Sequence, residues 1–422
     1  MTAIPTTQVT IRATPEQRRA RVVGVILVVL AAFVFWAFGL NVMGDLNAIF
    51  LITLPTDRFA NIGWEINTRT LAYIVAGILA FLGGMQLWRS SEKRTNSALA
   101  IGLVLFAFSF LAWAAGGKSF SLVGMLRSTV ILSVPVTIGA LSGIMCERVA
   151  VINIGIEGQL LASAFAATIL GSAFGLWAGV IGALVVGALL GAFLAWLSIR
   201  FRVDQIISGV VINIFTLGLT SFLATRVLAQ APDLNSAPQF GAITIPILAD
   251  IPLLGAMFFN HNWFVYVMLL LVVILHLGFF YTRWGLRSRS VGEHPRAADT
   301  VGINVFSTRY RNVILGGLIA GFGGAFLSLS QVSRFEENMT AGIGFIGLAA
   351  MIFGRWMPFG ALAAGLVFGF ARALQQKLGI LATPIPSEFL LMTPYLVTIV
   401  VVAGLAGRAT PPAADGVPYE KQ

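Results

Sequence analysis

Long apolar runs separated by short polar stretches dominate the hydropathy pattern of this chain. A helix needs about 20 apolar residues to cross a bilayer, and residues 342–354 form a shorter run that indicates a half-helix or re-entrant turn. The pattern therefore predicts an all-α polytopic membrane protein with about ten to twelve transmembrane segments, including broken or re-entrant helices. The predicted spans are residues 22–40, 71–88, 98–115, 122–145, 155–170, 176–198, 206–228, 263–281, 313–329, 361–378 and 389–406.

The basic residues between these runs predict the orientation of the chain. Residues 1–21 contain four arginines and Glu16 as their only acid, so the positive-inside rule places them in the cytoplasm. A tight turn with Arg200 and Arg202 is then cytoplasmic as well, whereas residues 231–262 contain aspartates but no lysine or arginine. We expect that segment to be an outer loop with a short interfacial helix, and we expect a cytoplasmic C-terminus.

These features divide the sequence into four parts. A cytoplasmic N-terminal segment (1–21) precedes a group of N-terminal transmembrane spans (22–121). A core of further transmembrane segments (122–406) follows, with a cytoplasmic loop at 281–311, and a polar, proline-bearing tail (407–422) ends the chain. The composition of the tail predicts disorder. Pairs of glycines at a spacing of four, such as Gly187/Gly191 and Gly317/Gly321, predict close helix packing; Gly171/Gly175 and Gly365/Gly369 have the same spacing.

Composition agrees with a membrane protein, because 58% of the 422 residues are hydrophobic and only 10% are charged. Soluble domains carry about 25% charged residues. The single cysteine, Cys146, cannot form an internal disulfide, and no Cys/His cluster has metal-ligand spacing, so we expect no metal site. The net charge of +10 is spread over connecting loops, which indicates orientation in lipid and no nucleic-acid partner.

The sequence contains no convincing catalytic or nucleotide-binding motif. The nearest match to a phosphate-binding loop ends at Gly117-Lys118-Ser119, but Ala112 replaces its first glycine and a membrane span precedes it. His261, His276 and His294 are scattered, and no serine or cysteine has a base at motif spacing. We therefore expect neither an enzyme nor a cofactor, and any ATP-driven work would need a separate subunit.

A basic island at residues 281–311 lies between two long apolar segments. It contains six arginines against Glu293 and Asp299. Pro295 suits the first position of a helix, and Gly302 is placed to end it, which predicts a surface helix of about two turns. Charge and capping leave two roles open: a solvated loop that only sets topology, or a helix on which another subunit docks.

A polar cluster interrupts the apolar pattern between the fourth and fifth predicted spans. An ionisable group at membrane depth costs about 2.5–3.5 kcal/mol, so it faces a cavity or a partner. Glu147 and Arg148 are adjacent, and we expect each to find a different partner. The remaining polar residues serve either as interhelical hydrogen-bonding groups or as the lining of a substrate path. These substrate-path candidates are Asn153, Glu157 and Gln159, with Asn213 as a further candidate.

Four stretches of the sequence resemble one transporter family. They are ERVAVINIGIEGQLLASAFAA, DQIISGVVINIFTLGLTSFL, WGLRSRSVGEHPRAADTVGIN and NMTAGIGFIGLAAMIFGRWMPFGALAAGLVFGFARALQ. Together they cover most of residues 125–406 and resemble the inner-membrane permease subunits of ABC importers for branched-chain amino acids, ribose and nucleosides. The NIGxEG and GExPRAADxxGI spellings are similar to the nucleoside or simple-sugar branch. Two positions depart from the pattern: His294, where asparagine is expected, and Ile343, where a polar residue is common.

The resemblance implies a function for the basic island. Residues 292–304 would form a coupling helix that inserts into a groove of a cytoplasmic ABC ATPase. Its residues would be Gly292, Glu293, Pro295, Arg296, Asp299 and Gly302. The family also implies a bacterial inner-membrane location, a second permease subunit (a copy or a paralogue) and an extracytoplasmic binding protein or lipoprotein. Nucleosides are the favoured cargo, with simple sugars as the alternative.

An ion-coupled secondary transporter that uses Glu157 as its proton or sodium site is a further alternative. It predicts an internal repeat, which the sequence does not show convincingly.

Overall fold

The computed structural model describes residues 15–41, 46–52, 63–89, 92–249, 251, 254–381, 386–392, 395–396, 399 and 410–421. Two compact units form the chain. Unit 1 comprises Met1–Leu122 with Leu378–Ile385, and unit 2 comprises Val123–Lys377 with Pro386–Gln422.

Unit 1 consists of apolar helices and a small sheet. Its elements are α1 (Pro15–Phe33) with a π-helical continuation (Val34–Leu40), β1 (Asn47–Leu51), β2 (Gly63–Asn67), α2 (Thr68–Arg89), α3 (Glu92–Ala114) and β3 (Ser119–Ser121). Strand β1 pairs antiparallel with β2 and parallel with β3. The helices follow the predicted spans, whereas the strands were not predicted, because a few residues in polar loops carry no clear alternation.

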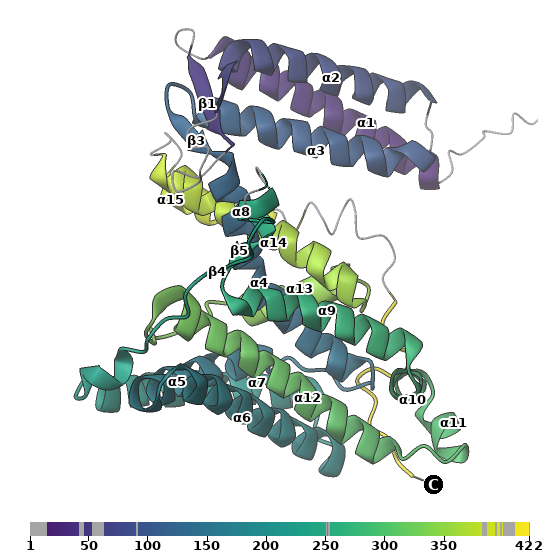
Figure 1. Cartoon of the computed structure of the whole chain (residues 1–422). Helices are drawn as coiled ribbons and strands as arrows, with labels where there is room; N and C mark the ends of the chain where they lie inside the picture. Colours follow the sequence, from purple (N-terminus) through teal and green to yellow (C-terminus); the bar gives the residue numbers. More distant parts are fainter. Residues whose placement is uncertain are drawn as a thin grey trace, which may run out of the picture. The chain divides into compact units, whose positions relative to one another are not determined.

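Unit 2 contains the remaining long helices (Figure 1). They are α4 (Leu122–Glu147), α5 (Ile156–Phe174), α6 (Leu176–Ala195), α7 (Gln205–Leu223), α9 (Trp263–Tyr281), α12 (Val305–Phe326) and α14 (Pro358–Ile380). Short π-helical turns extend α6, α7 and α12. The shorter elements are 3-10 turn Pro232–Asn235, β4 (Ile243–Thr244), α8 (Leu254–Phe258), β5 (Asn260–His261), α10 (Arg283–Glu293), α11 (Pro295–Thr300), α13 (Ile343–Phe353) and α15 (Ser387–Leu391).

The predicted fold class is confirmed. Among the described residues, ten helices are long and apolar enough to cross a membrane. The short apolar helix α13 lies at the predicted half-helix, and α8 at the predicted short helix of the outer loop. Helix α12 begins at Val305, earlier than the predicted span, because its first turns are polar. Most of the predicted span 389–406 lies outside the described residues.

Helix α4 continues through Pro135 to Glu147. Proline removes one backbone donor from a helix, and neighbouring helices can tolerate this inside a membrane bundle. The helical pattern stops at residues 148–155, within the polar stretch that separates the fourth and fifth predicted spans, and we call this segment the α4–α5 junction. Ala150 in this junction has a φ of 60°, so the chain changes direction there.

Close glycine contacts join α6 to α12, which lie side by side in Figure 1. A Cβ atom on Gly187 would lie 2.3 Å from the Gly317 carbonyl oxygen, and one on Gly191 would lie 2.8 Å from the Val313 carbonyl oxygen. The predicted packing role of these glycines is therefore confirmed. Gly175 differs, because nothing lies near its Cβ position and its φ of 92° serves the turn between α5 and α6.

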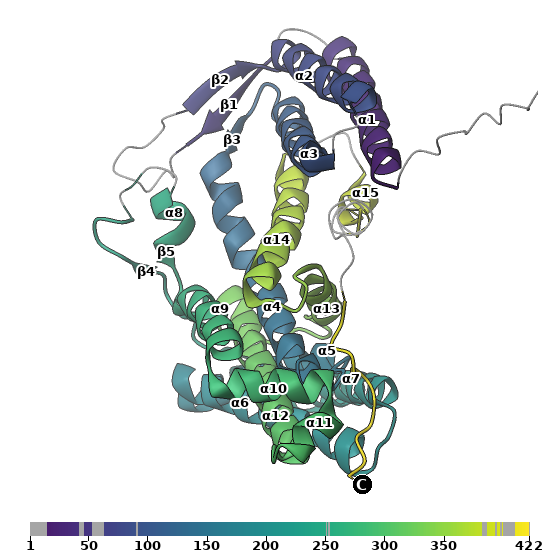
Figure 2. The same ribbon diagram turned by 90° about the vertical axis from the view of Figure 1, so that its right-hand side faces the viewer.

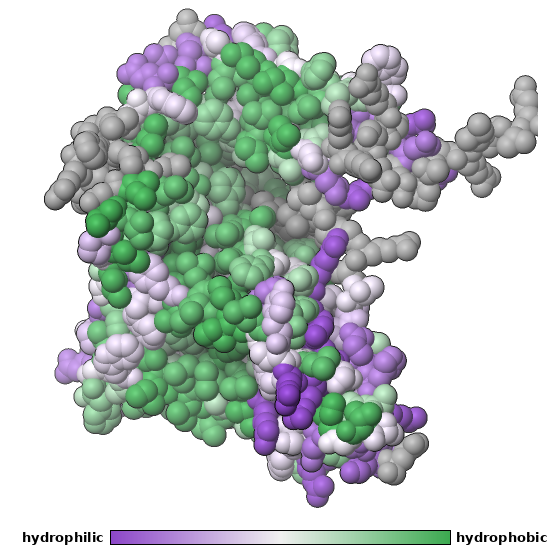
Figure 3. Space-filling model, turned by 45° about the vertical axis from the view of Figure 1, so that its right-hand side comes forward, coloured by the Kyte–Doolittle hydropathy of each residue, from purple (hydrophilic) through white to green (hydrophobic). Residues whose placement is uncertain are grey.

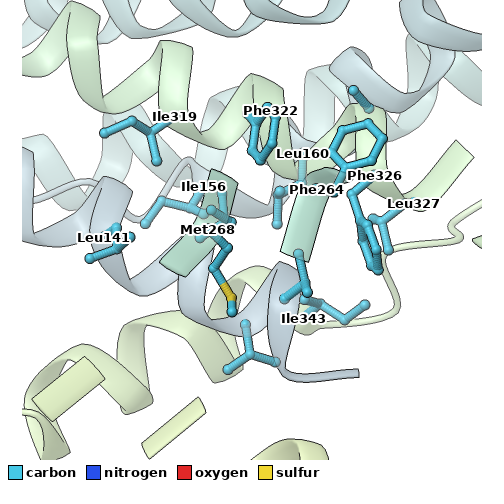
Figure 4. Packing of buried hydrophobic residues seen from close by; sticks show 14 of the residues in the cluster. Leu141, Ile156, Leu160, Phe264, Met268, Ile319, Phe322, Phe326, Leu327 and Ile343 are labelled. Atoms are coloured by element: carbon cyan, nitrogen blue, oxygen red, sulfur yellow. The ribbon is translucent and has the colours of Figure 1, made fainter. Parts of the chain in front are cut away.

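The core of unit 2 is apolar and draws on helices from all parts of its sequence. Figure 4 shows side chains of α4, α5, α9, α12 and α13 that interlock there. Phe264, Phe322 and Phe326 form a group of ring contacts at its centre, with centroids 4.9–5.7 Å apart. Such contacts stabilise the helix packing beyond the area that they bury. Figure 3 shows the hydrophobic surface of the long helices and hydrophilic residues gathered where α10 and α11 lie.

The expected disorder of the C-terminal tail is wrong for residues 410–421. This segment, which we call the C-terminal strap, runs beside α10 and α11 to the chain end in Figure 2. Pro412, Ala414 and Tyr419 are buried within unit 2. Composition predicted disorder because the segment has few apolar residues, but these few residues find a preformed surface on the helices.

Candidate functional site

Two amides at the α4–α5 junction are completely buried. Asn153 donates from Nδ2 to Oε1 of Gln159 at 3.0 Å and lies 3.5 Å from the Cys146 sulfur. Asn153 Oδ1 and Gln159 Nε2 have no hydrogen-bond partner among the described residues. Because an unpaired buried polar group costs about 1–3 kcal/mol, this acceptor and this donor require a partner that the described part of unit 2 does not supply.

Asn213 completes the first turn of α5 from the neighbouring helix α7. Its Oδ1 accepts from the Gly158 amide at 2.8 Å, and its Nδ2 donates to the Ile154 carbonyl oxygen at 2.9 Å. Gly158 and Ile154 are four residues apart, so the side chain bridges two groups that would otherwise bond to each other in a longer helix. Helix starts leave such donors unpaired. Asn213 thus fixes the end of the junction against α7.

Glu157 binds the start of α13. Its two carboxylate oxygens accept from the amides of Gly342 and Gly344 at 2.8 and 2.6 Å. Free amides and the helix dipole both favour an anion at a helix N-terminus. A Cβ atom on Gly344 would lie 2.6 Å from the Glu157 backbone, so only glycine permits this approach. The site joins two helices that are far apart in the sequence.

Glu147 and Arg148 both hold Trp356, which lies in the turn between α13 and α14. The indole nitrogen donates to Glu147 at 2.5 Å, and Arg148 donates from Nε and Nη2 to the Trp356 carbonyl oxygen at 3.1 and 2.7 Å. The expectation that the two residues have different partners was therefore wrong. Their side chains do diverge, but one tryptophan presents two polar groups and accommodates both.

Burial lowers the pKa of Arg148, and neighbouring Arg289 lowers it further, while Glu293 opposes the shift. Arg148 also lies over the ring of Phe280, 5.5 Å from its centroid. The Arg148 guanidinium is therefore stabilised by the Phe280 ring and the Trp356 carbonyl oxygen, and not by a hydrogen bond to any carboxylate among the described residues. The role of Trp356 could not be predicted from the sequence, because its contacts depend on residues more than 200 positions away in the chain.

The predicted surface helix in the basic island is confirmed as α11. Pro295 is its first residue, and Gly302 has a φ of 85° just beyond its end. The Gly302 amide bonds to the Asp299 carbonyl, and the Ile303 amide bonds to that of Ala298. This pair of bonds is the Schellman arrangement of a helix C-terminus. Local sequence therefore determines both ends of α11.

The coupling-loop candidates differ in exposure and contacts. Arg296 is exposed, as are Glu293 and the neighbouring Val301, which is 74% exposed. The Glu293 carboxylate accepts from the Ala413 amide at 3.1 Å. Asp299 is partly buried and lies 3.8 Å from the Lys421 ammonium. The outer face of α11 is thus exposed, while the carboxylates of Glu293 in α10 and Asp299 in α11 face the C-terminal strap.

Gly292 brings this helix pair to the α4–α5 junction. It is buried, and a Cβ atom at this position would lie 2.4 Å from the Arg148 carbonyl oxygen. Any displacement of α10 and α11 would therefore displace Arg148, which donates hydrogen bonds to the Trp356 carbonyl oxygen. The structure places Gly292, Glu293, Pro295, Arg296, Asp299 and Gly302 together at this end of unit 2, and Asn153, Glu157, Gln159 and Asn213 together at the junction.

The apolar helices of the described residues define a multi-pass membrane protein, in which a capped polar helix packs on a break between two spans. Residues 125–405 match the family model described as "Branched-chain amino acid transport system / permease component". No solved structure matches the chain.

Curated relatives agree with this family. The chain is 40% identical to the guanosine ABC transporter permease protein NupQ of Bacillus subtilis over 307 residues, which cover 70% of this chain and 96% of that protein. It is 38% identical to the nucleoside ABC transporter permease protein NupC of Lactococcus lactis, with the same coverage. It is 34% identical to the putative glucose ABC transporter permease protein TsgC13 of Haloferax volcanii, over 60% of this chain and 77% of that protein.

The chain belongs to this family of ABC importer permeases. It is a multi-pass plasma-membrane subunit of a family that does not itself carry out catalysis and that works with an ATPase subunit and a substrate-binding protein. The matched region begins close to the start of unit 2, so the three long helices of unit 1 precede it in the sequence.

Proposed function

We propose that this chain forms one half of the membrane pathway of an ATP-driven nucleoside importer. The single observation that carries the proposal is the contact of Gly292 with the Arg148 carbonyl, because it links a capped cytoplasmic helix to a break between membrane spans. ATP would be hydrolysed by a separate subunit, and this chain would have no nucleotide-binding or catalytic site of its own. A rigid helix can transmit the motion of that subunit, whereas a flexible loop would absorb it.

Nucleosides are the favoured cargo because relatives named for guanosine and for nucleosides match nearly their whole length at 38–40% identity. A relative named for glucose matches at 34% identity over a smaller share, which supports a simple sugar as the second candidate. Both cargoes are neutral and rich in hydrogen-bonding groups. An amide-lined path would suit either one.

The outer face of α11 is the proposed ATPase contact. Arg296 and Glu293 would form its polar contacts, Pro295 and Gly302 would fix its two ends, and Asp299 would support it from below. Exposed Val301 adds an apolar contact at the tip. Interfaces of this type combine a small apolar centre with charged residues that set the docking register.

The substrate path would run along the α4–α5 junction. Asn153 and Gln159 hold an acceptor and a donor that have no partner among the described residues, and these atoms would meet the cargo when the junction opens. Glu157 and Asn213 would fix the two ends of the junction during that motion. We also propose a second permease subunit, a copy or a paralogue, on the other side of the path, and a binding protein or lipoprotein that delivers the cargo.

Uptake measurements test the cargo. A strain that lacks this chain should lose import of tritiated nucleosides, and the full-length chain produced with its ATPase and partner permease should restore it. Excess unlabelled guanosine or adenosine should compete, while excess glucose should not. Competition by glucose alone would replace the nucleoside proposal with the sugar candidate, and uptake abolished by an uncoupler but independent of ATP would overturn the importer proposal.

Charge reversal tests the docking helix. Arg296→Glu should lower ATP-dependent uptake at least about tenfold, because a like-charge contact at an interface costs more than about 1.4 kcal/mol. Arg283→Glu, an exposed arginine at the start of α10, is the matched control and should retain most uptake. Equal uptake by both variants, with an unchanged yield of the ATPase complex, would rule out α11 as the contact.

A further inference from the structure

The C-terminal strap connects four separate elements on one face of unit 2. The Ala414 amide donates to the Gly292 carbonyl oxygen at 3.0 Å, next to the bond between Ala413 and Glu293. Gly416 lies against Ile152 of the α4–α5 junction. Farther along, Glu420 forms an ion pair with Arg202 in the connection between α6 and α7. The strap thus contacts α10, α11, the junction and this connection within twelve residues.

Tyr419 inserts into an apolar cluster that the same elements share. Its side chain is buried and belongs to a cluster with Cys146 of α4, Val151 of the junction, Ala298 of α11 and others. Its ring contacts Phe306 at a centroid distance of 5.4 Å, and its hydroxyl forms a hydrogen bond with Asp299. One aromatic side chain therefore holds α11 against the first turn of α12.

The strap also compensates a buried charge. The Arg309 side chain is 2% exposed, and its Nη1 donates to the Val417 carbonyl oxygen at 3.2 Å. Arg309 Nε and Nη2 have no hydrogen-bond partner among the described residues, and the nearby anion that interacts with this guanidinium is Asp415. Removing the strap would leave a buried cation with neither its hydrogen bond nor its counter-charge, which is strongly unfavourable.

The Asp415 carboxyl in turn interacts with the carboxyl group of Glu147, which accepts the hydrogen bond of Trp356. Through this interaction the strap reaches Glu147, the last residue of α4. The chain of contacts therefore runs from α11 through the strap to the junction, parallel to the direct contact of Gly292 with Arg148. A helix as short as α11 has few contacts of its own, so a second attachment would prevent it from tilting when it is loaded.

We propose that the C-terminal strap is a stationary clamp that holds the coupling helix α11 on the α4–α5 junction, with Tyr419 as its main positioning residue. This inference rests on the proposed function, because it assumes that α11 receives the ATPase. The clamp does not itself bind nucleotide or cargo. Without it, the ATPase still docks on the exposed face of α11 and hydrolyses ATP, but the motion is lost before it reaches the junction.

The first test separates coupling from folding. Tyr419→Ala, assembled with the ATPase and partner permease, should retain ATP hydrolysis while nucleoside uptake falls at least about fivefold, so that more ATP is consumed for each nucleoside imported. Tyr419→Phe keeps the ring contact with Phe306 and should recover most uptake. A parallel fall of hydrolysis and uptake in proportion to the folded protein, or no change in either activity, would overturn the clamp.

The second test locates the strap directly. Cys146 is buried, so the pair Arg202→Cys and Glu420→Cys would add the accessible thiols for a short bismaleimide. The purified permease alone should cross-link, and the cross-linked complex should keep its uptake because the clamp does not move. No cross-link, or uptake lost only in the cross-linked double variant and not in the treated single variants, would contradict the proposal.

The two proposals fail in distinguishable ways. If the unmodified chain supports no ATP-dependent uptake, the proposed function is wrong, whether or not the strap cross-links. If the unmodified chain supports uptake and Tyr419→Ala is equally active, only the clamp is wrong.

Discussion

The α4–α5 junction and the helix pair α10–α11 lie against each other, yet they are built in opposite ways. In the junction, polar groups are buried and bonded to distant parts of the chain, as with Glu157 and the start of α13. In α11, the two ends are fixed by neighbouring residues, and the outer face is exposed. The difference separates a part whose polar groups are satisfied internally from a part whose surface is exposed, as the proposed docking of an ATPase would require.

Under the proposed function, the contact between these regions is the place where a movement of α11 would reach the junction. Gly292 approaches the Arg148 carbonyl without a side chain between them, so a movement of the helix pair reaches the junction directly. Stability should therefore depend mainly on the junction, whereas changes at the ends of α11 should affect coupling more than folding. The following changes test this contrast in order of expected size.

Loss of the Glu157 carboxylate should have the largest effect. Glu157→Ala removes two hydrogen bonds to a charged acceptor and should lower the free energy of unfolding by about 3 kcal/mol. The thermal unfolding midpoint of the purified protein measures this change. The control Glu336→Gln removes an exposed ion pair with Arg334 and should cost less than about 1 kcal/mol. A similar midpoint for both variants would show that the junction does not dominate stability.

Adding a methyl group between the α10–α11 pair and the α4–α5 junction should have the next largest effect on stability. Gly292→Ala places a Cβ atom 2.4 Å from the Arg148 carbonyl oxygen, and such overpacking costs about 1–3 kcal/mol. Uptake should fall together with the unfolding midpoint. Gly218→Ala in α7 is the control, since nothing lies within 4 Å of its Cβ position, and it should leave both unchanged. Normal uptake by Gly292→Ala would mean that this contact transmits no motion.

The end of α11 should be less sensitive. Gly302 has a φ of 85° and open space around its Cβ position, so Gly302→Ala adds only the cost of a left-handed residue, about 1–2 kcal/mol. Gly302→Asn should recover part of it, because asparagine tolerates this conformation better. Hydrogen exchange of the α11 amides is the measurement, with Gly241→Ala as the unstrained control. Equal exchange in all variants would contradict a cap at Gly302.

The smallest expected effect is a pH dependence of the strap. Burial raises the pKa of Asp415 from its ordinary value of 3.8 to about 6, although bonds to Glu147 and Gly416 and the charge of Arg309 oppose the shift. The folded state therefore binds this proton more tightly than the unfolded state. Asp415 therefore stabilises the folded state fully below about pH 4, and this contribution to the free energy of unfolding is lost as the pH rises through about 6.

Asp415→Asn should remove this dependence. The unfolding midpoint of the unmodified protein should fall relative to that of the variant between about pH 4 and pH 6 and then stay level. Asp233→Asn is the control, since exposed Asp233 lies in the turn Pro232–Asn235, which is none of the elements that the strap contacts. A constant difference between the Asp415→Asn variant and the unmodified protein across this range would show that Asp415 does not titrate in the strap.

The sequence predicted what depends on neighbouring residues. Pro295 and Gly302 specified α11, the apolar runs specified the membrane helices, and the paired glycines of α6 and α12 specified a close crossing. The long-range partners could not be predicted in this way. Trp356 is held by residues more than 200 positions away, and Gly344 is required only because Glu157 lies against it.

The strap shows the same limit more clearly. Its composition predicted disorder, because twelve residues with a few apolar side chains cannot bury enough surface by themselves. Tyr419 becomes buried only because α4, α11 and α12 together form its cluster. A surface built from several helices is not visible in any one segment of the chain.

The sequence alone determined the membrane class, the approximate positions of the spans and the position of helix α11, because hydropathy and helix capping act over a few residues. Only the tertiary structure decided which groups satisfy Glu157, Arg148 and Arg309 and where the C-terminal strap lies. Buried polar groups must find partners wherever packing brings them, and that pairing is a property of the assembled helices.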